Sequence, residues 1–434
     1  MEYQLKDSGV EWLGEIPEHW EVDKISYRYD NISSGTTPST SNQSYYFNGH
    51  TKWLQTGDLT DGDVKETSKS LTSEALEKYS TLKIYPTGSL VMAMYGATIG
   101  KLGILKATMT TNQACCVFPA NEKVYTKFMF YNLMASRSEI INMSYGGGQP
   151  NISQKLIRNL RTYFPPKQEQ TAIAEYLDQA TEKIDQTIAT KEAQLDTLTQ
   201  YRKSLIQEKV TKGLTPNPTL KDSGVEWLGE IPEHWEVDRI KDISKLRTDK
   251  TSEKSEVEDY IELEDMSQWT GKILSFRSTI EVESSVTLFE EGDVLFGKLR
   301  PYLAKYALAD REGKCTGEIL AIFPERVHGS FLKYYLGSSN FIKRCDDFSY
   351  GAKMPRISWN KQLNTFEIPL PPKAEQIAIA EYLDQATEKI DSTSQNLRDQ
   401  IDTLKKYRKS LIQEVVTGRK RVYHQDLTST SHAE

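Results

Sequence analysis

The sequence predicts an α+β protein in which a tandem duplication places two mixed α/β domains and two long helices in alternation. Residues 5–25 (LKDSGVEWLGEIPEHWEVDKI) return as residues 220–240 with one change, a lysine to an arginine. Residues 172–185 (AIAEYLDQATEKID) return unchanged as residues 378–391. The stretches between these copies look almost unrelated. Because the offsets are 215 and 206 residues, they indicate duplication of whole domains rather than a solenoid of short repeats.

A repeated frame with different inserts suggests one architecture that presents two different specificities. We call residues 5–25 and 220–240 the frame segments, and the unlike domain that follows each of them an insert. The expected boundaries are 1–23 for the N-terminal frame region, 24–164 for the first insert, 165–213 for the first long helix, 214–238 for a linker and the repeated frame region, 239–370 for the second insert, 371–418 for the second long helix and 419–434 for a polar tail.

Charge is distributed unevenly along the chain. The net charge of −7 argues mildly against a simple nucleic-acid binder. Residues 24–165, however, hold 15 Lys and Arg against 9 Asp and Glu, and residues 294–361 hold 12 against 6. Basic regions therefore lie within both inserts, while the rest of the chain is acidic. This pattern is typical of DNA-binding domains mounted on a scaffold that does not touch DNA.

Cysteine usage and hydropathy place the chain among reduced, cytoplasmic proteins. No apolar run is long enough to span a bilayer, and we expect no membrane partner. The four cysteines show no C-x-x-C spacing. We therefore expect reduced, partly buried thiols and no zinc site.

Both inserts are expected to be mixed α+β domains. In the first, clusters of Gly, Asn, Ser and Thr alternate with short β-like runs such as residues 88–95. A helical stretch near residues 127–141 precedes a glycine-rich loop at residues 144–151 (SYGGGQPN). The frame region before this insert, punctuated by tryptophan and proline, has no helical period and predicts an extended arm and turn.

A long helix is predicted after each Pro-Pro pair, at about residues 168–210 and 375–416. About 40 helical residues span roughly 60 Å. Each helix has an apolar seam that must be buried against a partner, and the other helix is the natural one. The alternative is that each helix packs only on its own domain. The predicted helix-pairing residues are Leu177, Ile184, Leu198 and Leu205 in the first helix, with Tyr201 beside them, and Leu383, Ile390, Leu397, Leu404 and Leu411 in the second.

No catalytic or metal-binding constellation is found. Residues 96–101 (GATIGK) resemble a phosphate-binding loop, but they are one residue short and Leu102 replaces the required Ser or Thr. The sequence contains no H-E-x-x-H, G-x-S-x-G or G-x-G-x-x-G motif. His19 and His234 lie in the frame segments, where a structural role is favoured. We therefore assign no catalytic residue and no metal ligand.

Several segments, taken in order, resemble a known family. They are residues 35–59, which open the first insert; residues 144–153 (SYGGGQPNIS) and 349–358 (SYGAKMPRIS), which share S-Y-G-x-x-x-P-x-I-S; residues 292–309 with 315–324; and residues 165–185 with 371–391 (PPK-x-EQ-x-AIAEYLDQATEKID). Together they resemble the specificity subunit of type I restriction–modification enzymes over essentially the whole chain.

The resemblance implies a ring-like, pseudo-two-fold subunit. Two target-recognition domains are held apart by two antiparallel helices, and each domain recognises one half of a split DNA site. The helices set the gap and dock two adenine-methyltransferase subunits, and motor-nuclease subunits complete the complex. S-adenosylmethionine, ATP and Mg²⁺ are expected in those partners and none in this chain. A helical spacer of roughly 60 Å exceeds one DNA turn of about 34 Å, which suits separated half-sites.

Residues able to contact base edges or phosphates from loops are the candidate DNA-binding set. Asn and Gln suit adenine and Arg suits guanine, while Lys155, Arg158 and Arg161 suit phosphates. In the first insert the candidates are Lys101, Asn112, Gln113, Tyr145, Gln149, Asn151, Lys155 and Arg158. In the second insert they are Lys298, Arg300, Tyr302, Lys305, Tyr350, Lys353 and Arg356. Tyr145 and Tyr350 precede unlike sequences at equivalent positions, which favours a structural or general backbone role for both.

Two other functions stay open on the sequence. The first is a coiled-coil interaction scaffold with two protein-binding domains and no DNA recognition. The second is a solitary nuclease, although its usual motifs are missing. A gel shift with random-sequence DNA and a metal-dependent cleavage assay would separate these alternatives from a DNA-recognition subunit.

Overall fold

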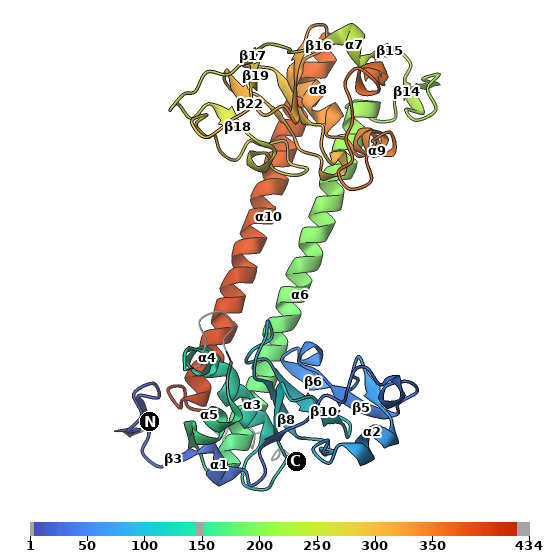
Figure 1. The fold of residues 1–434 in the computed structure, drawn as a ribbon. Coiled ribbons are helices and arrows are strands. Elements are labelled where there is room, and N and C mark those ends of the chain that lie inside the picture. The colour runs from blue at the N-terminus through green and yellow to red at the C-terminus, as the bar shows by residue number, and fades with distance from the viewer. Residues whose placement is uncertain (1–3, 144–150, 423–434) are drawn as a thin grey trace. The chain divides into compact units, whose positions relative to one another are not determined.

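The chain forms two compact units. The computed structural model describes residues 4–143 and 151–422. One unit combines Met1–Ala189 with Gln400–Glu434, and the other is Thr190–Asp399. Each unit holds one frame segment, one insert, the first part of the helix that follows this insert and the last part of the other helix. The two long helices, α6 (Lys167–Lys212) and α10 (Lys373–Val416), therefore each pass from one unit into the other (Figure 1).

The frame segments form the same small structures in both units. Each begins with an antiparallel hairpin, made by β1 (Leu5–Asp7) with β2 (Glu15–Pro17), and by β13 (Leu220–Asp222) with β14 (Glu230–Pro232). The following strand pairs with the last strand of the insert: β3 (Glu21–Lys24) with β12 (Arg161–Phe164), and β15 (Glu236–Arg239) with β24 (Glu367–Leu370). Each insert thus leaves and rejoins the frame on one two-stranded ladder.

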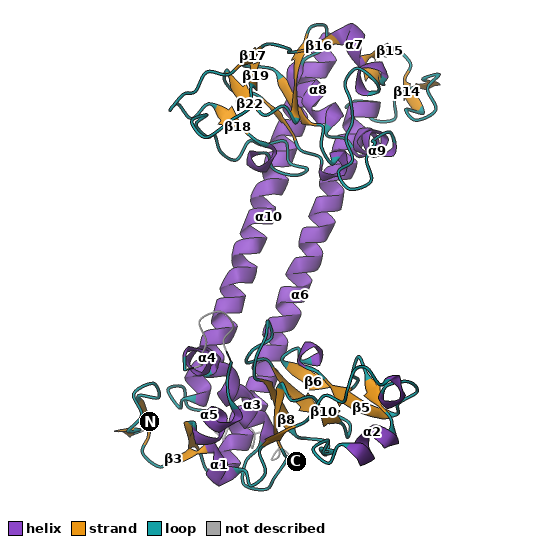
Figure 2. Cartoon of the chain, in the orientation of Figure 1, coloured by secondary structure: helices purple, strands orange, loops and turns teal. Residues whose placement is uncertain are grey.

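The first insert contains a five-stranded sheet, in the order β4-β11-β8-β9-β6, and a three-stranded sheet, β10-β5-β7 (Figure 2). The strands are β4 (Ser33–Ser34), β5 (Thr51–Leu54), β6 (Gly62–Val64), β7 (Ser70–Leu71), β8 (Leu90–Ala93), β9 (Leu102–Leu105), β10 (Thr110–Thr111) and β11 (Cys115–Phe118). The helices are α1 (Ile25–Arg28), α2 (Ser73–Lys78), α3 (Thr126–Ala135), α4 (Arg137–Asn142) and α5 (Gln154–Asn159), with 3₁₀ turns η1 (Gln43–Tyr45) and η2 (Thr56–Asp58).

The second insert has two four-stranded sheets, β16-β23-β20-β21 and β17-β19-β22-β18. The strands are β16 (Ser244–Leu246), β17 (Lys250–Thr251), β18 (Tyr260–Ile261), β19 (Val286–Phe289), β20 (Val294–Gly297), β21 (Tyr306–Leu308), β22 (Gly313–Cys315) and β23 (Ile319–Pro324). The helices are α7 (Ile240–Ile243), α8 (Gly329–Leu336) and α9 (Ser339–Asp347), with 3₁₀ turns η3 (Leu263–Asp265), η4 (Pro301–Leu303) and η5 (Leu363–Thr365).

The two inserts share a core despite their unlike sequences. The order β4-β11-β8-β9 in the first corresponds to β16-β23-β20-β21 in the second, and every one of these pairings is antiparallel. The central strands β8 and β20 are buried along their whole length, as apolar residues covered on both faces require. The predicted mixed α/β inserts and the two long antiparallel helices are confirmed.

Two positions per heptad are buried along α6, and one of these residues, Thr181, bonds to Tyr131 of the insert. Within the first unit, Leu177, Ile184 and Leu411 are buried, and so are Thr181 and Ile188, which alternate with them in steps of three and four residues. The sequence prediction named one of these positions in both helices, and it placed Tyr201 in the second position of the first helix. Of its members, Leu205, Leu383 and Ile390 are also buried, whereas Leu198, Leu397 and Leu404 are half-buried. Tyr201 is 54% exposed and was wrongly placed in the seam.

Ion pairs fix the antiparallel direction within each unit. In the first, Arg408 of α10 donates to Asp185 of α6 at 2.9 Å, and Lys420 lies over the ring of Tyr176. In the second, Arg202 of α6 donates to Asp391 of α10 at 3.0 Å. These are reciprocal pairs, because Arg202 and Arg408 occupy the same place in the repeated YRKSLIQE segment.

The first turn of α6 binds both the frame and the insert. Glu169 Oε2 lies 2.8 Å from His19 Nε2 and accepts a hydrogen bond from Trp20 Nε1 at 3.1 Å. Gln170 accepts the backbone N–H of Tyr125 at 2.8 Å and donates to the Pro165 carbonyl at 2.9 Å. These contacts attach the start of α6 to both the frame and the insert.

The same contacts recur at α10, although a different insert supplies them. Glu375 Oε2 lies 2.8 Å from His234 Nε2 and accepts from Trp235 Nε1 at 3.1 Å. Gln376 accepts the backbone N–H of His328 at 2.7 Å and donates to the Pro371 carbonyl at 2.8 Å. Tyr125 and His328 are the N-cap residues of α3 and α8, so equivalent backbone groups of the two inserts meet equivalent glutamines.

A tyrosine completes the attachment about two turns further along each long helix. Tyr131 Oη donates to Asp178 at 2.9 Å and Tyr334 Oη donates to Asp384 at 2.6 Å. Both tyrosines stand six residues after the N-cap of their helix. Burial raises the pKa of each phenol, and the neighbouring carboxylate acts in the same direction. Both therefore remain neutral donors at physiological pH.

The cysteines and histidines give no sign of a metal centre in the described part of the chain. All four cysteines are free and buried, and burial raises the pKa of Cys315 to about 12. Residues 4–143 and 151–422 contain no group of three His, Cys, Asp or Glu that could hold a metal ion. No helix within these residues combines the length and the apolar character needed to cross a membrane.

Truncation of the buried seam residues should destabilise the fold. Leu383→Ala removes a fully buried side chain and should lower the free energy of unfolding by about 2–5 kcal/mol. Leu397→Ala, at a half-buried position of the same heptad series, should cost clearly less. Urea unfolding of the two variants tests this, and equal midpoints would contradict the packing described.

Loss of the tyrosine hydroxyl should weaken each insert's attachment. Tyr131→Phe and Tyr334→Phe each remove a hydrogen bond to a carboxylate and should cost about 1.5–3 kcal/mol. Tyr201→Phe, at an exposed position of α6, is the matched control and should change little. Thermal unfolding curves in which all three variants coincide with the unmodified chain would show that these contacts contribute nothing.

Candidate nucleic-acid interface

A hairpin loop leaves the central strand of the main sheet in each insert. Residues 94–101 (MYGATIGK) join β8 to β9, and residues 298–305 (KLRPYLAK) join β20 to β21. The loops have the same length and connect equivalent strands, yet their sequences differ. We call them the central hairpin loops. The GATIGK segment that resembled a phosphate-binding loop is thus part of a β-hairpin and does not open a helix.

Residues 151–153 and 356–358, which end the shared P-x-I-S motif, lie beside these loops in the same register. Ile152 N–H donates to the Met94 carbonyl at 2.8 Å, and Ile357 N–H donates to the Lys298 carbonyl at 2.9 Å. The variable residue of each segment forms an antiparallel bridge with the second loop residue, Asn151 with Tyr95 and Arg356 with Leu299. The motif therefore places an asparagine in one insert where it places an arginine in the other.

The residues that precede β11 and β23 complete each site. Met94 N–H donates to the Ala114 carbonyl at 2.8 Å, and Lys298 N–H donates to the Glu318 carbonyl at 3.0 Å. Three segments of each insert thus meet through backbone hydrogen bonds. Because backbone groups hold the site together, its side chains can differ without loss of the geometry.

In the first insert this arrangement brings together four of the predicted residues, Lys101, Asn112, Gln113 and Asn151. Asn112 Oδ1 accepts the Ala114 N–H at 3.1 Å and so shapes the backbone. Gln113 is exposed and accepts a hydrogen bond from the Thr37 hydroxyl. Lys101 is half-buried, and Asn151 is exposed. Tyr145 and Gln149 lie outside the described residues.

Tyr95 was missed by the sequence analysis. It is half-buried between Asn151 and Gln113. Burial raises the pKa of its phenol, so the group stays neutral and can donate one hydrogen bond. Only its place two residues after a buried strand could have identified it, and that place becomes visible once the hairpin is known.

The predicted phosphate-binding residues of the first insert lie elsewhere. Lys155 and Arg158 are exposed on α5, and Arg161 is exposed at the start of β12. Arg158 donates to the Ile32 carbonyl at 3.3 Å. Lys155 and Arg161 line a shallow cavity of about 530 Å³ together with Trp12 of the frame. They belong to the side of the insert that adjoins the frame, not to the hairpin site.

In the second insert, the central hairpin loop and the P-x-I-S segment hold several exposed side chains. Arg300 N–H donates to the Pro355 carbonyl at 2.7 Å, which ties the two segments together. Arg300, Tyr302, Tyr350 and Lys353 are exposed, and Lys298 is half-buried. Tyr350 exchanges two backbone hydrogen bonds with Arg356.

Two of the predicted DNA-binding cations of this insert already have hydrogen-bond partners within it. Arg356 donates to Glu318 Oε1 at 3.1 Å while its side chain remains 42% exposed. The Lys305 ammonium donates to the Leu263 carbonyl, so the structure favours a supporting role for Lys305 within the insert. Lys298, Arg300 and Arg356 remain as the basic groups of the loop surface.

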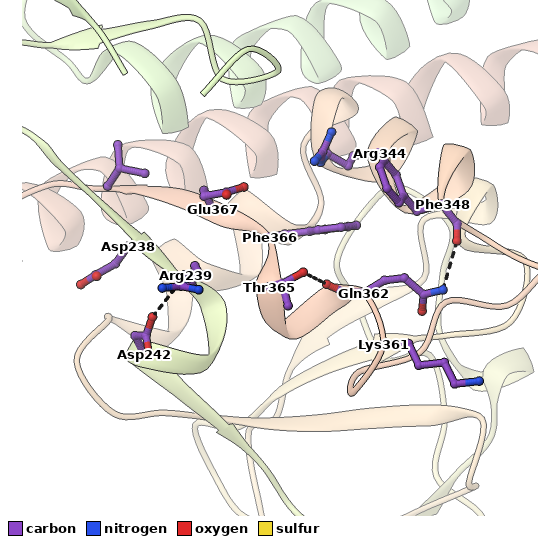
Figure 3. Close-up of a pocket in the computed structure, with 11 residues that line it drawn as sticks. Asp238, Arg239, Asp242, Arg344, Phe348, Lys361, Gln362, Thr365, Phe366 and Glu367 are labelled. Carbon is purple, nitrogen blue, oxygen red and sulfur yellow. Dashed lines mark hydrogen bonds and ion pairs between the residues drawn. The ribbon is translucent and has the colours of Figure 1, made fainter. Parts of the chain in front are cut away.

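A polar pocket of about 610 Å³ lies at the junction of β15 and η5 (Figure 3). It contains no predicted DNA-binding residue. Acidic and basic side chains alternate around it, and Arg239 pairs with Asp242 at 3.5 Å. The Arg344 guanidinium stacks on the rings of Phe348 and Phe366 at 4.6 and 5.1 Å. These contacts indicate that the residues around the pocket stabilise the junction between the insert and the frame.

Comparison with known proteins places this geometry in a family. The model described as "Type I restriction modification DNA specificity domain" matches residues 17–197 and 232–403, one match for each frame segment with its insert and helix. The chain is 26% identical to the specificity subunit of the type I restriction enzyme MjaVIII of Methanocaldococcus jannaschii, over 97% of this chain and 98% of that protein. It is 24% identical to the specificity subunit of the Escherichia coli enzyme EcoDI, over 68% and 70%.

Solved structures share the fold at low sequence identity. A chain from a study of complex assembly and conformational transition of the type I R-M system aligns with a TM-score of 0.72 and 14% identity, over 92% of this chain and 98% of that one. The HsdS subunit from Thermoanaerobacter tengcongensis aligns with a TM-score of 0.53 and 15% identity, over 93% and 98%. Two family matches that together span most of the sequence settle the assignment: this chain belongs to the type I restriction–modification DNA specificity family.

Proposed function

We propose that each insert is a target-recognition domain that binds one half of an asymmetric, bipartite DNA site. The observation that supports this most directly is the pair of equivalent sites described above. The same three backbone segments meet in both inserts, while the side chains they present differ. A symmetric site would need only two copies of one domain, so two unlike domains imply two unlike half-sites.

The chemistry of the side chains suggests what each domain recognises. Gln113 and Asn151 in the first domain present amides, which suit the N6 and N7 edge of adenine. Arg300 and Arg356 in the second present guanidinium groups, which suit the O6 and N7 edge of guanine. Tyr145 and Gln149 stay candidates on sequence grounds.

The remaining basic residues suit the DNA backbone. The exposed Lys155, Arg158 and Lys353 would contact phosphates, which position a protein on the duplex without identifying its sequence. Lys298 and Tyr302 flank Arg300 and would extend the contact of that loop. Lys305 would support the loop from within.

The long helices have a separate role in this proposal. They set the gap between the half-sites and dock two methyltransferase subunits, to which motor-nuclease subunits add. S-adenosylmethionine, ATP and Mg²⁺ would be bound by those partners, and this chain would perform no chemical step. The family assignment disfavours a scaffold without DNA recognition. Sequencing of methylated adenines in cells that carry this chain and its methyltransferase subunits would identify the site, and a continuous or palindromic site would contradict the proposal.

Arg300→Ala should relax one base position in one half-site only. A bidentate contact to a base is worth about 1–3 kcal/mol of discrimination, so the second domain should accept other bases at that position. Arg311→Ala is the matched control, because Arg311 is also exposed but pairs with Asp310 on another loop. Methylation mapping that showed equal weakening of both half-sites would instead indicate phosphate contact or misfolding.

The isolated chain should lack methyl-transfer activity. It has no residues assigned to bind S-adenosylmethionine, so the purified chain should not methylate DNA until its methyltransferase subunits are added. Transfer of a tritiated methyl group to genomic DNA measures this. Methylation by the chain alone, after removal of any copurified subunit, would contradict the assignment.

A further inference from the structure

Arg202 is a buried cation of α6 at the helix pair. Its side chain is 8% exposed, although arginine is seldom buried unless paired. The three nitrogens of its guanidinium each have an acceptor: Nε donates to Asp391 Oδ1 at 3.0 Å, Nη1 to the Trp269 carbonyl at 2.6 Å and Nη2 to the Thr270 carbonyl at 2.9 Å. One side chain of α6 thus binds both α10 and a turn of the second insert.

Further contacts hold the same turn against the helices. Lys203 Nζ lies 3.7 Å from the ring centre of Trp269. Lys272 Nζ pairs with Asp391 Oδ2 at 3.0 Å, so this aspartate is bound by cations from both the helix and the insert. Residues 269–272 are therefore attached to α6 and α10 by charge-assisted bonds, which are stronger than bonds between neutral groups.

Residues 269–272 also bind the central hairpin loop of the second insert. Trp269 N–H donates to the Ala304 carbonyl at 2.9 Å, and Gln268 forms an antiparallel bridge with Lys305. Tyr306 Oη donates to the Trp269 carbonyl at 3.2 Å, and its ring is fully buried. Arg202 is thus connected, through one turn, to residues 304–306, the C-terminal end of the central hairpin loop and the start of β21.

The backbone of these elements is strained where they meet. Trp269, Arg300 and Ala304 have φ values of +64°, +49° and +47°, a region that favours glycine. The other non-glycine residues with positive φ in the described chain are asparagines and aspartate, which adopt it more readily. Such strain persists only where surrounding contacts fix the conformation, and it is concentrated at functional sites.

The equivalent arginine of the other helix lacks this connection. Arg408 donates to Asp185 from Nε and Nη2, and these are its hydrogen bonds among the residues that the structure describes. Its side chain is 29% exposed and that of Asp185 is 52% exposed. Two arginines in identical repeats, with equivalent aspartates, therefore differ in their bonds to an insert and in their exposure.

We propose that Arg202 is a positioning residue for DNA recognition by the second domain, because it fixes the Trp269 turn and thereby the central hairpin loop that presents Arg300. This inference rests on the proposed function of that domain. It assigns the helix pair a part in the specificity of one half-site, in addition to the spacing between half-sites. Arg408 makes no corresponding contribution to the first half-site.

The test compares Arg202→Ala, Arg202→Lys, Arg408→Ala and Arg300→Ala in the full chain, each co-expressed with the methyltransferase subunits of its own system. Methylated adenines are sequenced, and the melting temperature of each purified complex is measured. The half-site that Arg300→Ala alters identifies the target of the second domain. Arg202→Lys keeps a charge opposite Asp391, but a single ammonium cannot reproduce the planar fork that reaches both carbonyls.

The expected result is a roughly ten-fold loss of discrimination in the half-site of the second domain for Arg202→Ala. Arg202→Lys should show a smaller loss there. The first half-site and the gap should be unchanged in both variants, and Arg408→Ala should preserve both half-sites. Because a merely destabilised chain would lose methylation at all sites alike, confinement to one half-site separates positioning from stability.

Three results would overturn the inference. If Arg202→Lys keeps the full profile while Arg300→Ala relaxes one half-site, the proposed function stands and the positioning role is wrong. If Arg202→Lys weakens both half-sites equally, Arg202 is a general stabilising residue. If Arg300→Ala and both Arg202 variants all leave recognition unchanged, the hairpin loop does not contact bases, and the proposed site is wrong as well.

Discussion

The attachment of each insert to the N-terminal part of its own helix is the constraint on which the rest of the structure depends. In the first unit, Glu169 binds the frame, while Gln170 and Asp178 bind the insert. The insert contributes a backbone N–H at the start of α3, the hydroxyl of Tyr131 and the ammonium group of Lys127, which pairs with Asp178. Because the N–H is available from any residue but proline, that part of the attachment places few demands on the sequence of the insert. The frame can therefore stay constant while the inserts diverge.

The use of backbone groups also explains how the candidate DNA-binding sites can differ in their side chains. Their three segments meet through backbone hydrogen bonds, so Asn151 and Arg356 can occupy one position in the two inserts. Under the proposed function, discrimination between bases would depend on side chains that these backbone bonds do not involve. The second domain departs from this separation, because its hairpin loop is also tied to Arg202 through the Trp269 turn. The two domains are thus equivalent in their attachment to the helices and unequal in the support of their loops.

The sequence predicted the duplication, the mixed inserts and the helices, because near-identical repeats and apolar periodicity are visible without coordinates. It placed Tyr201 in the second heptad position of α6, since polar residues such as Thr181 and Arg202 occupy part of the buried face. It could not show that residues 94–101 and 298–305 are equivalent, because their register is set by backbone bonds. The sequence could not distinguish the supporting role of Lys305 from the predicted DNA contacts of its neighbours, since only the fold reveals its bond to the Leu263 carbonyl.

The central claim is that the inserts are independent recognition domains on a shared frame. Replacement of residues 26–164 by the corresponding insert of another specificity subunit tests it most directly, provided that the new insert has a tyrosine six residues after the equivalent helix N-cap. Methylated adenines mapped in cells that carry the chimera and the methyltransferase subunits should show one new half-site, with the other half-site and the gap unchanged. A changed gap, or a change in the half-site of the second domain, would contradict the account.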